Sequence, residues 1–458
     1  MVDIVPAETA IPSRIQFAQD RALEVKTTRK IILRIVPFLM LCYLISYVDR
    51  VNIGFAALQM NHDLALTGSQ FGLASSIFFI GYVIFEIPSN LLLEKFGARL
   101  WIARIMITWG IIGLFMAAVA GIYSLYVVRF LLGVAEAGFL PGVILYVSYW
   151  LPAEHRARVV SIFMVAIPLS SIVGSPISAA LLNLDGVLGL RGWQWLFIME
   201  SVPAIIAGFL CLKLLADRPG DVAWLNPEER NWLFSRLDEE RKLKHQVEHV
   251  PLWRLLGNKY VLVLGLAVGA GVATSTTLSI WQPQVIKSFG QSTSAVGWLN
   301  PLPFVLACAA MIMWGRRSDT KRERVFHTIA PLFVAAAAFA SAIFVTSILP
   351  TMIILCFALS ATYALKGPVW ALSTEWLSPT TAAAGIAAIN ALGNLWGALI
   401  VYFFGVVKDA TGSYREALLL LAALNAFALI SLAIMTSSRR GHWGFGRVTG
   451  SRSSLRVR

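Results

Sequence analysis

Two pairs of charged residues lie inside otherwise apolar stretches of the sequence. Asp49 and Arg50 lie in the first stretch, and Arg129 and Glu136 lie together in a later one. A charge within an apolar helix that crosses a bilayer costs ~2.5–3.5 kcal/mol on insertion scales, and such residues usually face an interior cavity. Guanidinium groups suit a carboxylate, because each can hold it through paired hydrogen bonds. Acids in the same place can load and release protons.

The spacing predicts that these side chains meet at one depth. Arg50 lies eight residues before the end of its stretch, and Arg129 lies seven residues into its own. At 1.5 Å per residue, both would lie ~10–12 Å below one surface. Glu136 follows Arg129 by two turns on the same helical face, and Tyr47 precedes Arg50 by three residues. We expect Tyr47, Arg50 and Arg129 to bind an anion, and Asp49 and Glu136 to carry protons.

A structural explanation of the same charges is a buried ion-pair network that only holds helices together. The functional interpretation is favoured, because four charges are more than helix association needs. For Glu86, two residues before Pro88, the commoner role is structural, as part of a hydrogen bond at a helix kink.

Three further polar residues in apolar stretches are candidate substrate contacts. Lys366 precedes Gly-Pro and would be either a third contact for the anion or a partner in a gate. Asn394 would suit a hydroxyl or carboxylate of the substrate, although an interhelical hydrogen bond worth ~0.6 kcal/mol is the alternative. Gln282 is a similar but weaker candidate.

Long apolar runs must position these residues. Of 458 residues, 57% are hydrophobic and 14% are charged, whereas soluble domains are nearer 45–50% apolar and about 25% charged. A transmembrane helix needs ~20 apolar residues. Twelve runs meet this requirement: Ile31–Leu58, Gln70–Leu93, Trp101–Ala120, Ile122–Leu145, Val159–Leu182, Trp195–Leu215, Tyr260–Ile286, Ala295–Gly315, Phe326–Thr346, Pro350–Thr374, Ala382–Val406 and Ala417–Met435.

The runs predict an all-α membrane protein with two six-helix, pseudo-symmetric halves. The halves would be joined by the one long polar stretch, with a short surface helix around Pro227–Lys244. The expected organisation is an N-terminal segment at 1–30, a first half at 31–215, a linker at 216–259, a second half at 260–437 and a basic tail at 438–458.

Matching turns support the repeat. Asn90 opens a turn with an acid at Glu94 and a base at Arg99, and Gly315 opens one with Asp319 and Arg324. Each turn follows the second helix of its half, so the pattern favours parallel repeats with a substrate site between them. We expect Glu94, Arg99, Asp319 and Arg324 to act in gating.

The distribution of basic residues predicts the orientation. Most Lys and Arg lie in the two terminal segments, the linker and every second loop, whereas the other loops carry only Arg191, Lys287, Lys408 and Arg415. Such asymmetry places both termini in the cytoplasm of a multi-pass protein of the inner, or plasma, membrane. The net charge of +13 therefore indicates orientation signals, and no nucleic-acid partner is expected.

Nothing in the sequence suggests a cofactor or a metal. The four cysteines lie in apolar runs without a CxxC pair, and the histidines lack metal-ligand spacing. An enzyme would need a nucleophile and base, and none is recognisable. The expected partners are a small organic acid anion, protons and the lipid bilayer, and we expect a monomer.

From about Lys30 to Met435 the chain resembles the major facilitator superfamily. The turns at Asn90 and Gly315 resemble its loop signature, although Asn90 stands where Gly is usual and Glu94 where Asp is usual. The motifs Tyr47-x-Asp-Arg-Val-Asn-Ile-Gly and Arg129-Phe-Leu-Leu-Gly-Val-Ala-Glu-Ala-Gly resemble the anion:cation symporter family. That resemblance implies proton-coupled uptake of carboxylates, with Arg50 and Arg129 on the anion and Asp49 and Glu136 carrying protons.

Further motifs look most like the bacterial tartrate, hydroxyphenylacetate and phthalate transporter branch. They include Phe-Glu86-Ile-Pro88-Ser-Asn90. The chain departs from that branch after Asn394, where Trp396-Gly397 replaces the expected Gly-Gly-Phe. Three functions stay open at this point: proton symport of a carboxylate, anion exchange or uniport, and a receptor without transport. The acids argue against a uniporter, and no sensory domain is present to favour a receptor.

Overall fold

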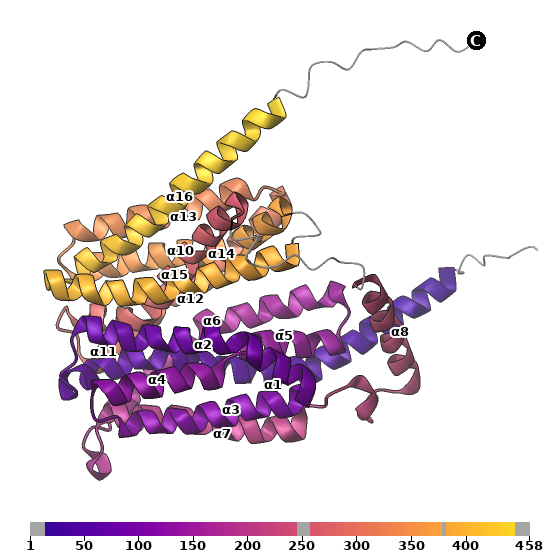
Figure 1. The fold of residues 1–458 in the computed structure, drawn as a ribbon, viewed down its shortest axis with the longest axis horizontal. Helices are drawn as coiled ribbons and strands as arrows, with labels where there is room; N and C mark the ends of the chain where they lie inside the picture. Colours follow the sequence, from indigo (N-terminus) through magenta and orange to yellow (C-terminus); the bar gives the residue numbers. More distant parts are fainter. Residues whose placement is uncertain (1–13, 245–256, 378–381, 445–458) are drawn as a thin grey trace, which may run out of the picture.

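The computed structural model describes residues 14–244, 257–377 and 382–444. Every regular element in these ranges is helical, and twelve spans are long and apolar enough to cross a membrane. The helices run side by side as one bundle (Figure 1). This confirms the predicted all-α class and the twelve spans, which follow because a backbone in lipid must satisfy its hydrogen bonds within each helix.

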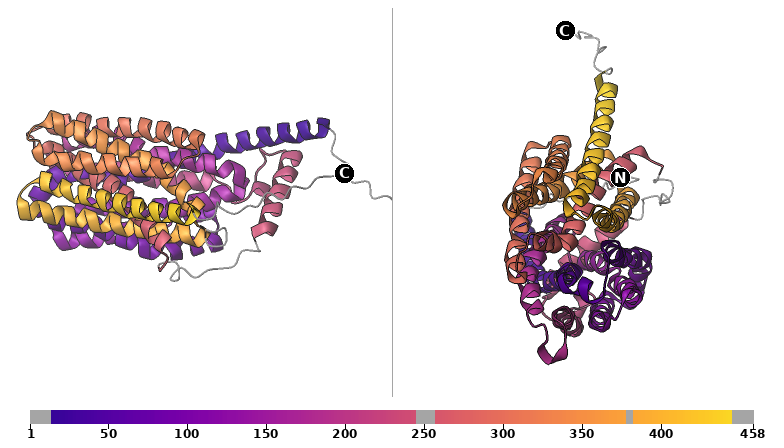
Figure 2. Two further views of the ribbon diagram at one scale, coloured as in Figure 1. Left: turned by 90° about the horizontal axis from the view of Figure 1, so that it is seen from above. Right: turned by 90° about the vertical axis from the view of Figure 1, so that its left-hand side faces the viewer.

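Two groups of helices, one from each half of the sequence, lie against each other (Figures 1 and 2). The first group contains α1 (Arg14–Asp63), α2 (Gly68–Phe96), α3 (Ala98–Phe115), α4 (Ile122–Glu136), α5 (Phe139–Trp150), α6 (Ala153–Leu182) and α7 (Gly192–Leu214). The second contains α10 (Lys259–Lys287), α11 (Thr293–Leu299), α12 (Pro301–Lys321), α13 (Val325–Ser341), α14 (Ile348–Trp376), α15 (Ala382–Thr411) and α16 (Tyr414–Gly444). The single-turn helices η1 (Met116–Ala118), η2 (Val187–Gly189), η3 (Pro219–Asp221) and η4 (Ala342–Phe344) lie in connections.

The polar stretch between the groups forms α8 (Pro227–Lys244), which confirms the predicted surface helix. It lies beyond one end of the bundle, where α1 also projects (Figure 2). Glu229 of α8 binds Lys30 of α1 at 2.8 Å, and Glu240 binds Arg156 of α6 at 2.7 Å. We call this the α8 end of the bundle and the opposite one the far end.

The predicted single helix over 122–145 is broken in the structure. It consists of α4 and α5, because Ala137 has ψ 133° and Gly138 has φ 81°. Glycine is required at 138, since a Cβ there would lie 2.6 Å from Ser89 Oγ and positive φ is strained for other residues. The run over 295–315 is likewise divided, into α11 and α12 at Asn300–Pro301, where proline has no N–H to continue the helix.

The two groups of helices meet closely at the far end. α2 packs on α15, α1 on α10, and α6 on α11 and α12. The carboxylate of Asp409 in α15 accepts hydrogen bonds from the backbone N–H groups of Gly68 and Ser69, at 2.8 and 2.6 Å. Further bonds between the groups join Asn61 to Gln284, Ser76 to the Ala398 carbonyl, Asn300 to Ser175, and Asn183 to Ser294. These contacts close the far end.

Candidate functional site

Glu136 ends α4 at the helix break and is completely buried. Its Oε1 accepts hydrogen bonds from Arg50 Nε at 2.7 Å and from Ser46 Oγ at 2.5 Å. Its Oε2 has no hydrogen-bond partner among the described residues. The acid of one predicted pair is therefore held by the arginine of the other, which joins α1 to α4.

Asp49 precedes Arg50 in the chain but has different hydrogen-bond partners. Its carboxylate accepts a hydrogen bond from Trp109 Nε1 in α3 at 2.5 Å and another from Asn52 Nδ2 at 3.0 Å. The residue is only 3% exposed. Asp49 is thus held by two neutral donors, and no direct ion pair involves it within the described ranges.

The two arginines flank the ring of Phe78 in α2. The guanidinium carbon of Arg129 lies 4.8 Å from the ring centre and that of Arg50 lies 5.6 Å from it. Arg50 also lies over Tyr47 and Tyr82, at 5.0 and 4.9 Å. The structure therefore brings Tyr47, Arg50 and Arg129 into one cluster.

Arg129 has unused hydrogen-bonding capacity. It is 1% exposed, and its Nε makes one long bond of 3.4 Å to the Ala74 carbonyl oxygen. Its Nη1 has no hydrogen-bond partner among the residues with described positions. A buried guanidinium donor without a partner is costly, so this group is available to an anionic ligand.

Lys366 of α14 contributes a cation from the other half. Its Nζ lies 4.0 Å from the centre of the Tyr363 ring, and no carboxylate within ion-pair distance is described for it. The hydroxyl of Tyr363 also has no hydrogen-bond partner among the described residues. The second half therefore also contains a partly buried cation without a described acidic partner.

Asn394 and Gln282 have different surroundings. Asn394 of α15 is partly exposed, two residues before Trp396, which packs on Gly269. Gln282 is fully buried five residues before the far end of α10, and its Nε2 donates to the carbonyl and to the side-chain oxygen of Asn300, both at 3.0 Å. The structure does not bring Gln282 into the arginine cluster.

Glu200 of α7 is a buried acid that the sequence analysis missed. It accepts a hydrogen bond from Ser178 Oγ at 2.7 Å and interacts with Asn52 and Asp49. The signal was present, because Glu200 lies inside the apolar run Trp195–Leu215 just as Glu136 lies inside its own. Ser46, Trp109 and Asn52 were also missed, since neutral polar residues give no comparable signal.

Residues 39–399 match the family described as the Major Facilitator Superfamily. The chain belongs to this superfamily. It is therefore a multi-pass membrane transporter and not an enzyme.

Curated relatives and solved structures of transporters are similar to this chain. A candidate tartrate transporter of Agrobacterium vitis is 48% identical over 90% of this chain and 94% of its own length. NicT, a candidate metabolite transport protein of Pseudomonas putida, is 37% identical over 88% of this chain and 93% of its own. A D-xylose–proton symporter shares the fold, with a TM-score of 0.70, 15% identity, and coverage of 88% of this chain and 97% of that one.

The signature turns of this facilitator lie at the α8 end. Arg324 binds Asp319 at 2.6 Å and lies 3.6 Å from Glu375 at the end of α14. Glu94 and Arg99 are exposed, and the backbone N–H of Arg99 donates to Asp217 at 3.0 Å. Among the described residues, no hydrogen bond or ion pair of Glu94, Arg99, Asp319 or Arg324 joins the two halves.

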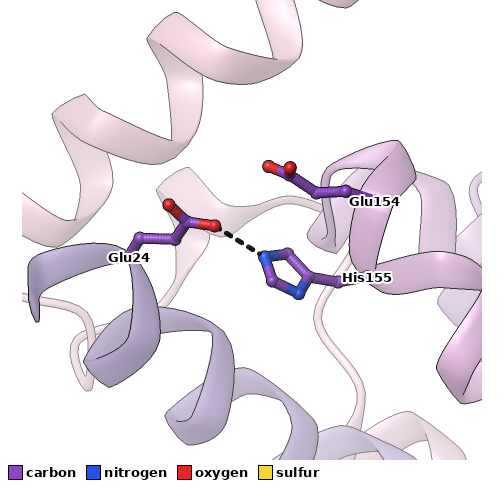
Figure 3. Close-up of side chains that lie close together, drawn as sticks. All are labelled: Glu24, Glu154 and His155. Carbon is purple, nitrogen blue, oxygen red and sulfur yellow. Dashed lines mark hydrogen bonds and ion pairs between the residues drawn. The ribbon is translucent and has the colours of Figure 1, made fainter. Parts of the chain in front are cut away.

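A second polar cluster at the α8 end joins α1 to α6 (Figure 3). His155 Nε2 lies 3.0 Å from Glu24 Oε1, and Glu154 lies beside them. No role is predicted for His155 from the sequence. Its contact with Glu24 ties the projecting part of α1 to the start of α6, well away from the arginine cluster along α1.

Proposed function

We propose that this facilitator is a proton-coupled symporter for a small organic anion, a carboxylate such as tartrate, a sugar acid or an aromatic acid. The observation that carries the proposal is the competition at Arg50. Glu136 occupies Arg50 Nε in this structure, while Arg129 and Lys366 have no acidic partner among the described residues. The names of the tartrate-transporter relatives support the substrate class.

Proton coupling would follow from this competition. An ionised Glu136 competes with a substrate carboxylate for the same guanidinium. A proton on Glu136 removes that charge and frees Arg50 for the anion, so proton and anion bind together. Asp49 would carry a second proton beside Trp109 and Asn52.

The anion would lie between the halves. Arg50, Arg129 and Tyr47 would bind it from one half, and Lys366 and Asn394 from the other. The position of Gln282 beside Asn300 favours a role in the far-end closure over contact with the anion. Glu94, Arg99, Asp319 and Arg324 would form the gate at the α8 end, where no described hydrogen bond or ion pair of these residues joins the two halves.

We assign the α8 end to the cytoplasm, because Lys26, Lys30, Arg99, Arg156 and Arg324 gather there. Both termini are then cytoplasmic, in an inner or plasma membrane, and the protein acts as a monomer. In this assignment the closed far end faces the outside. Alternating access requires the far end to open while the cytoplasmic end closes.

Uptake into proteoliposomes tests the proposal. The substrates are labelled tartrate, a sugar acid, phthalate and hydroxyphenylacetate, each measured with and without an inward proton gradient. Wild type should accumulate one of them only with the gradient. Arg129→Ala should abolish binding, and Glu136→Gln should stop accumulation while allowing exchange of anion for anion.

The matched control is Glu240→Gln, which removes a carboxylate at the protein's α8 end. It should behave as wild type. Gradient-independent uptake that survives both Arg129→Ala and Glu136→Gln would make the buried charges structural. Obligatory exchange by wild type would identify an exchanger instead.

A further inference from the structure

Glu200 is an acid that the proposed mechanism does not use. It lies in α7, is 6% exposed, and receives one hydrogen bond, from Ser178 in α6. Its Oε2 has no hydrogen-bond partner among the described residues, and no described Lys, Arg or His pairs with it. An ionised carboxylate in this place would lack compensation, which is costly in a low-dielectric interior.

The elements packed on α7 bring one titratable group to Glu200. From α1, Asp49 lies nearby, since its Oδ1 and the side chain of Ser201, the residue after Glu200, both lie within 4.0 Å of one point beside Gly113. The amide of Asn52 donates to Asp49 at 3.0 Å. From α6 comes the hydroxyl of Ser178. From α3, Gly110 and Gly113 pack on the neighbouring residue Ser201. No described Lys, Arg or His forms an ion pair with either acid.

Asp49 and Glu200 therefore form a pair of neighbouring acids with one amide that interacts with both. Two neighbouring carboxylates without a cation between them do not readily ionise together, and their protons are shared by the pair. A proton gained or lost at Glu200 thus changes the charge beside Asp49. Asp49 is one of the two proposed proton carriers and precedes Arg50 in the chain. The protonation of Glu200 therefore affects a residue of the proposed coupling site.

We propose that Glu200 carries a coupling proton in addition to those of Asp49 and Glu136. The inference rests on the proposed symport. In each cycle one H⁺ binds the Glu200 carboxylate when the site is open to the outside, and the same H⁺ leaves to the cytoplasm, so the carboxyl returns to its starting state. The alternative is a structural role, in which Glu200 stays protonated throughout the cycle and only links α6 to α7 through its hydrogen bond with Ser178.

The test is the ratio of protons to anions in proteoliposomes, with the membrane potential clamped at zero by potassium and valinomycin. The probe is labelled tartrate or the acid from the panel that wild type accumulates. At equilibrium each coupled proton raises accumulation about tenfold for each unit of pH gradient. Glu200→Gln keeps the shape and the hydrogen bonds but cannot ionise, so accumulation should fall about tenfold per unit.

Three further variants complete the design. Glu200→Asp retains an acid and should retain the wild-type ratio. Ser178→Ala removes the link between α6 and α7 and should also retain it. Glu229→Gln, which removes a buried carboxylate at the α8 end, is the matched control and should show the wild-type ratio.

The outcomes separate the two proposals. If wild type shows no gradient-driven accumulation, the proposed symport fails, and this inference fails with it. If wild type is coupled and Glu200→Gln keeps its ratio, Glu200 is structural and only the inference is overturned. If Glu200→Gln does not fold, the uptake rate of Glu200→Asp is measured across pH: a displaced rate profile with the wild-type ratio supports the inference, and an unchanged rate profile overturns it.

Discussion

At the scale of single residues, the site depends on which charge each arginine meets. Arg50 is engaged by Glu136 at 2.7 Å, whereas Arg129 makes one long bond and lies against Phe78. The two guanidiniums are therefore unequal before any anion arrives. Arg129 offers a donor without a described partner, and in the proposed mechanism Arg50 becomes free when Glu136 takes up a proton.

Replacement of Arg129 by lysine tests the role of its planar guanidinium. Arg129→Lys keeps the charge but not the paired donors, and losing one charge-assisted hydrogen bond costs ~1.5–3 kcal/mol. Anion affinity should fall ~10–100-fold. Equilibrium binding of the labelled anion measures this, with Arg104→Lys, beside Trp101 in α3, as the control. Equal affinities for Arg129→Lys and wild type would contradict the assignment.

At the scale of elements, the break between α4 and α5 decides where Glu136 points. An unbroken helix would continue past Glu136, whereas Ala137 and Gly138 turn the chain there. The break also lets the backbone at Gly138 approach Ser89 of α2. The acid of the site thus lies at a helix end, where its position is fixed by packing as well as by hydrogen bonding.

Substitution at the break should be destabilising. In Gly138→Val a branched side chain would need φ 81° and would meet Ser89, a strain of ~1–3 kcal/mol. Gly121→Ala is the control, because Gly121 is extended and has open space around it. Thermal unfolding in detergent should show a lowered midpoint for Gly138→Val and little change for Gly121→Ala. Equal midpoints for the two variants would show that the break tolerates a side chain.

The contact between α8 and α1 has a defined pH dependence. Burial opposes the charge of Glu229. Hydrogen bonds from Lys30 Nζ and from the backbone N–H of Asn226 nevertheless hold the pKa of Glu229 below its ordinary value. A lowered pKa contributes stability above the unfolded-state value of about 4.3, and this is lost as pH falls through the folded-state pKa. Glu229→Gln should therefore cost ~1–2 kcal/mol at pH 7 and progressively less in acid.

The measurement is the unfolding midpoint of wild type and Glu229→Gln between neutral and acidic pH. The two curves should converge below about pH 4.3. Asp238→Asn, which disrupts an exposed pair with Lys242 in the same helix, is the control. Curves that stay parallel would show that Glu229 does not contribute through its charge.

At the scale of the whole molecule, the two halves are held together mainly at the far end. The described bonds include Asp409 on the start of α2, and Asn183 Nδ2 on Ser294 Oγ at 3.2 Å. Each of these must break for the far end to open. In the proposed alternating access, this interface is the gate that is closed in this structure.

A disulfide across this gate should arrest transport. Asn183→Cys with Ser294→Cys places two thiols where the side chains now touch. Oxidation should reduce uptake at least about tenfold, because the far end can no longer open, and a reductant should restore it. Each single variant, Asn183→Cys or Ser294→Cys, is a control, because it shows whether oxidation links the introduced thiol to a native cysteine. Undiminished uptake by the fully cross-linked protein would mean that this end need not open.

The sequence alone determined the twelve spans, α8 and the presence of buried charges. Hydropathy is a local property, and a backbone in lipid must form helices whatever its neighbours are. The cost of an intramembrane charge likewise identified Asp49, Arg50, Arg129 and Glu136. The same signal was present at Glu200 and was overlooked.

Only the tertiary structure decided how these residues are paired. Glu136 contacts Arg50, which is 86 positions away, and Asp49 contacts Trp109, which is 60 positions away. Gln282 contacts Asn300, and Glu200 contacts Ser178. Such contacts depend on the rotation and packing of separate helices, and on the break at Gly138. No periodicity within one helix contains that information.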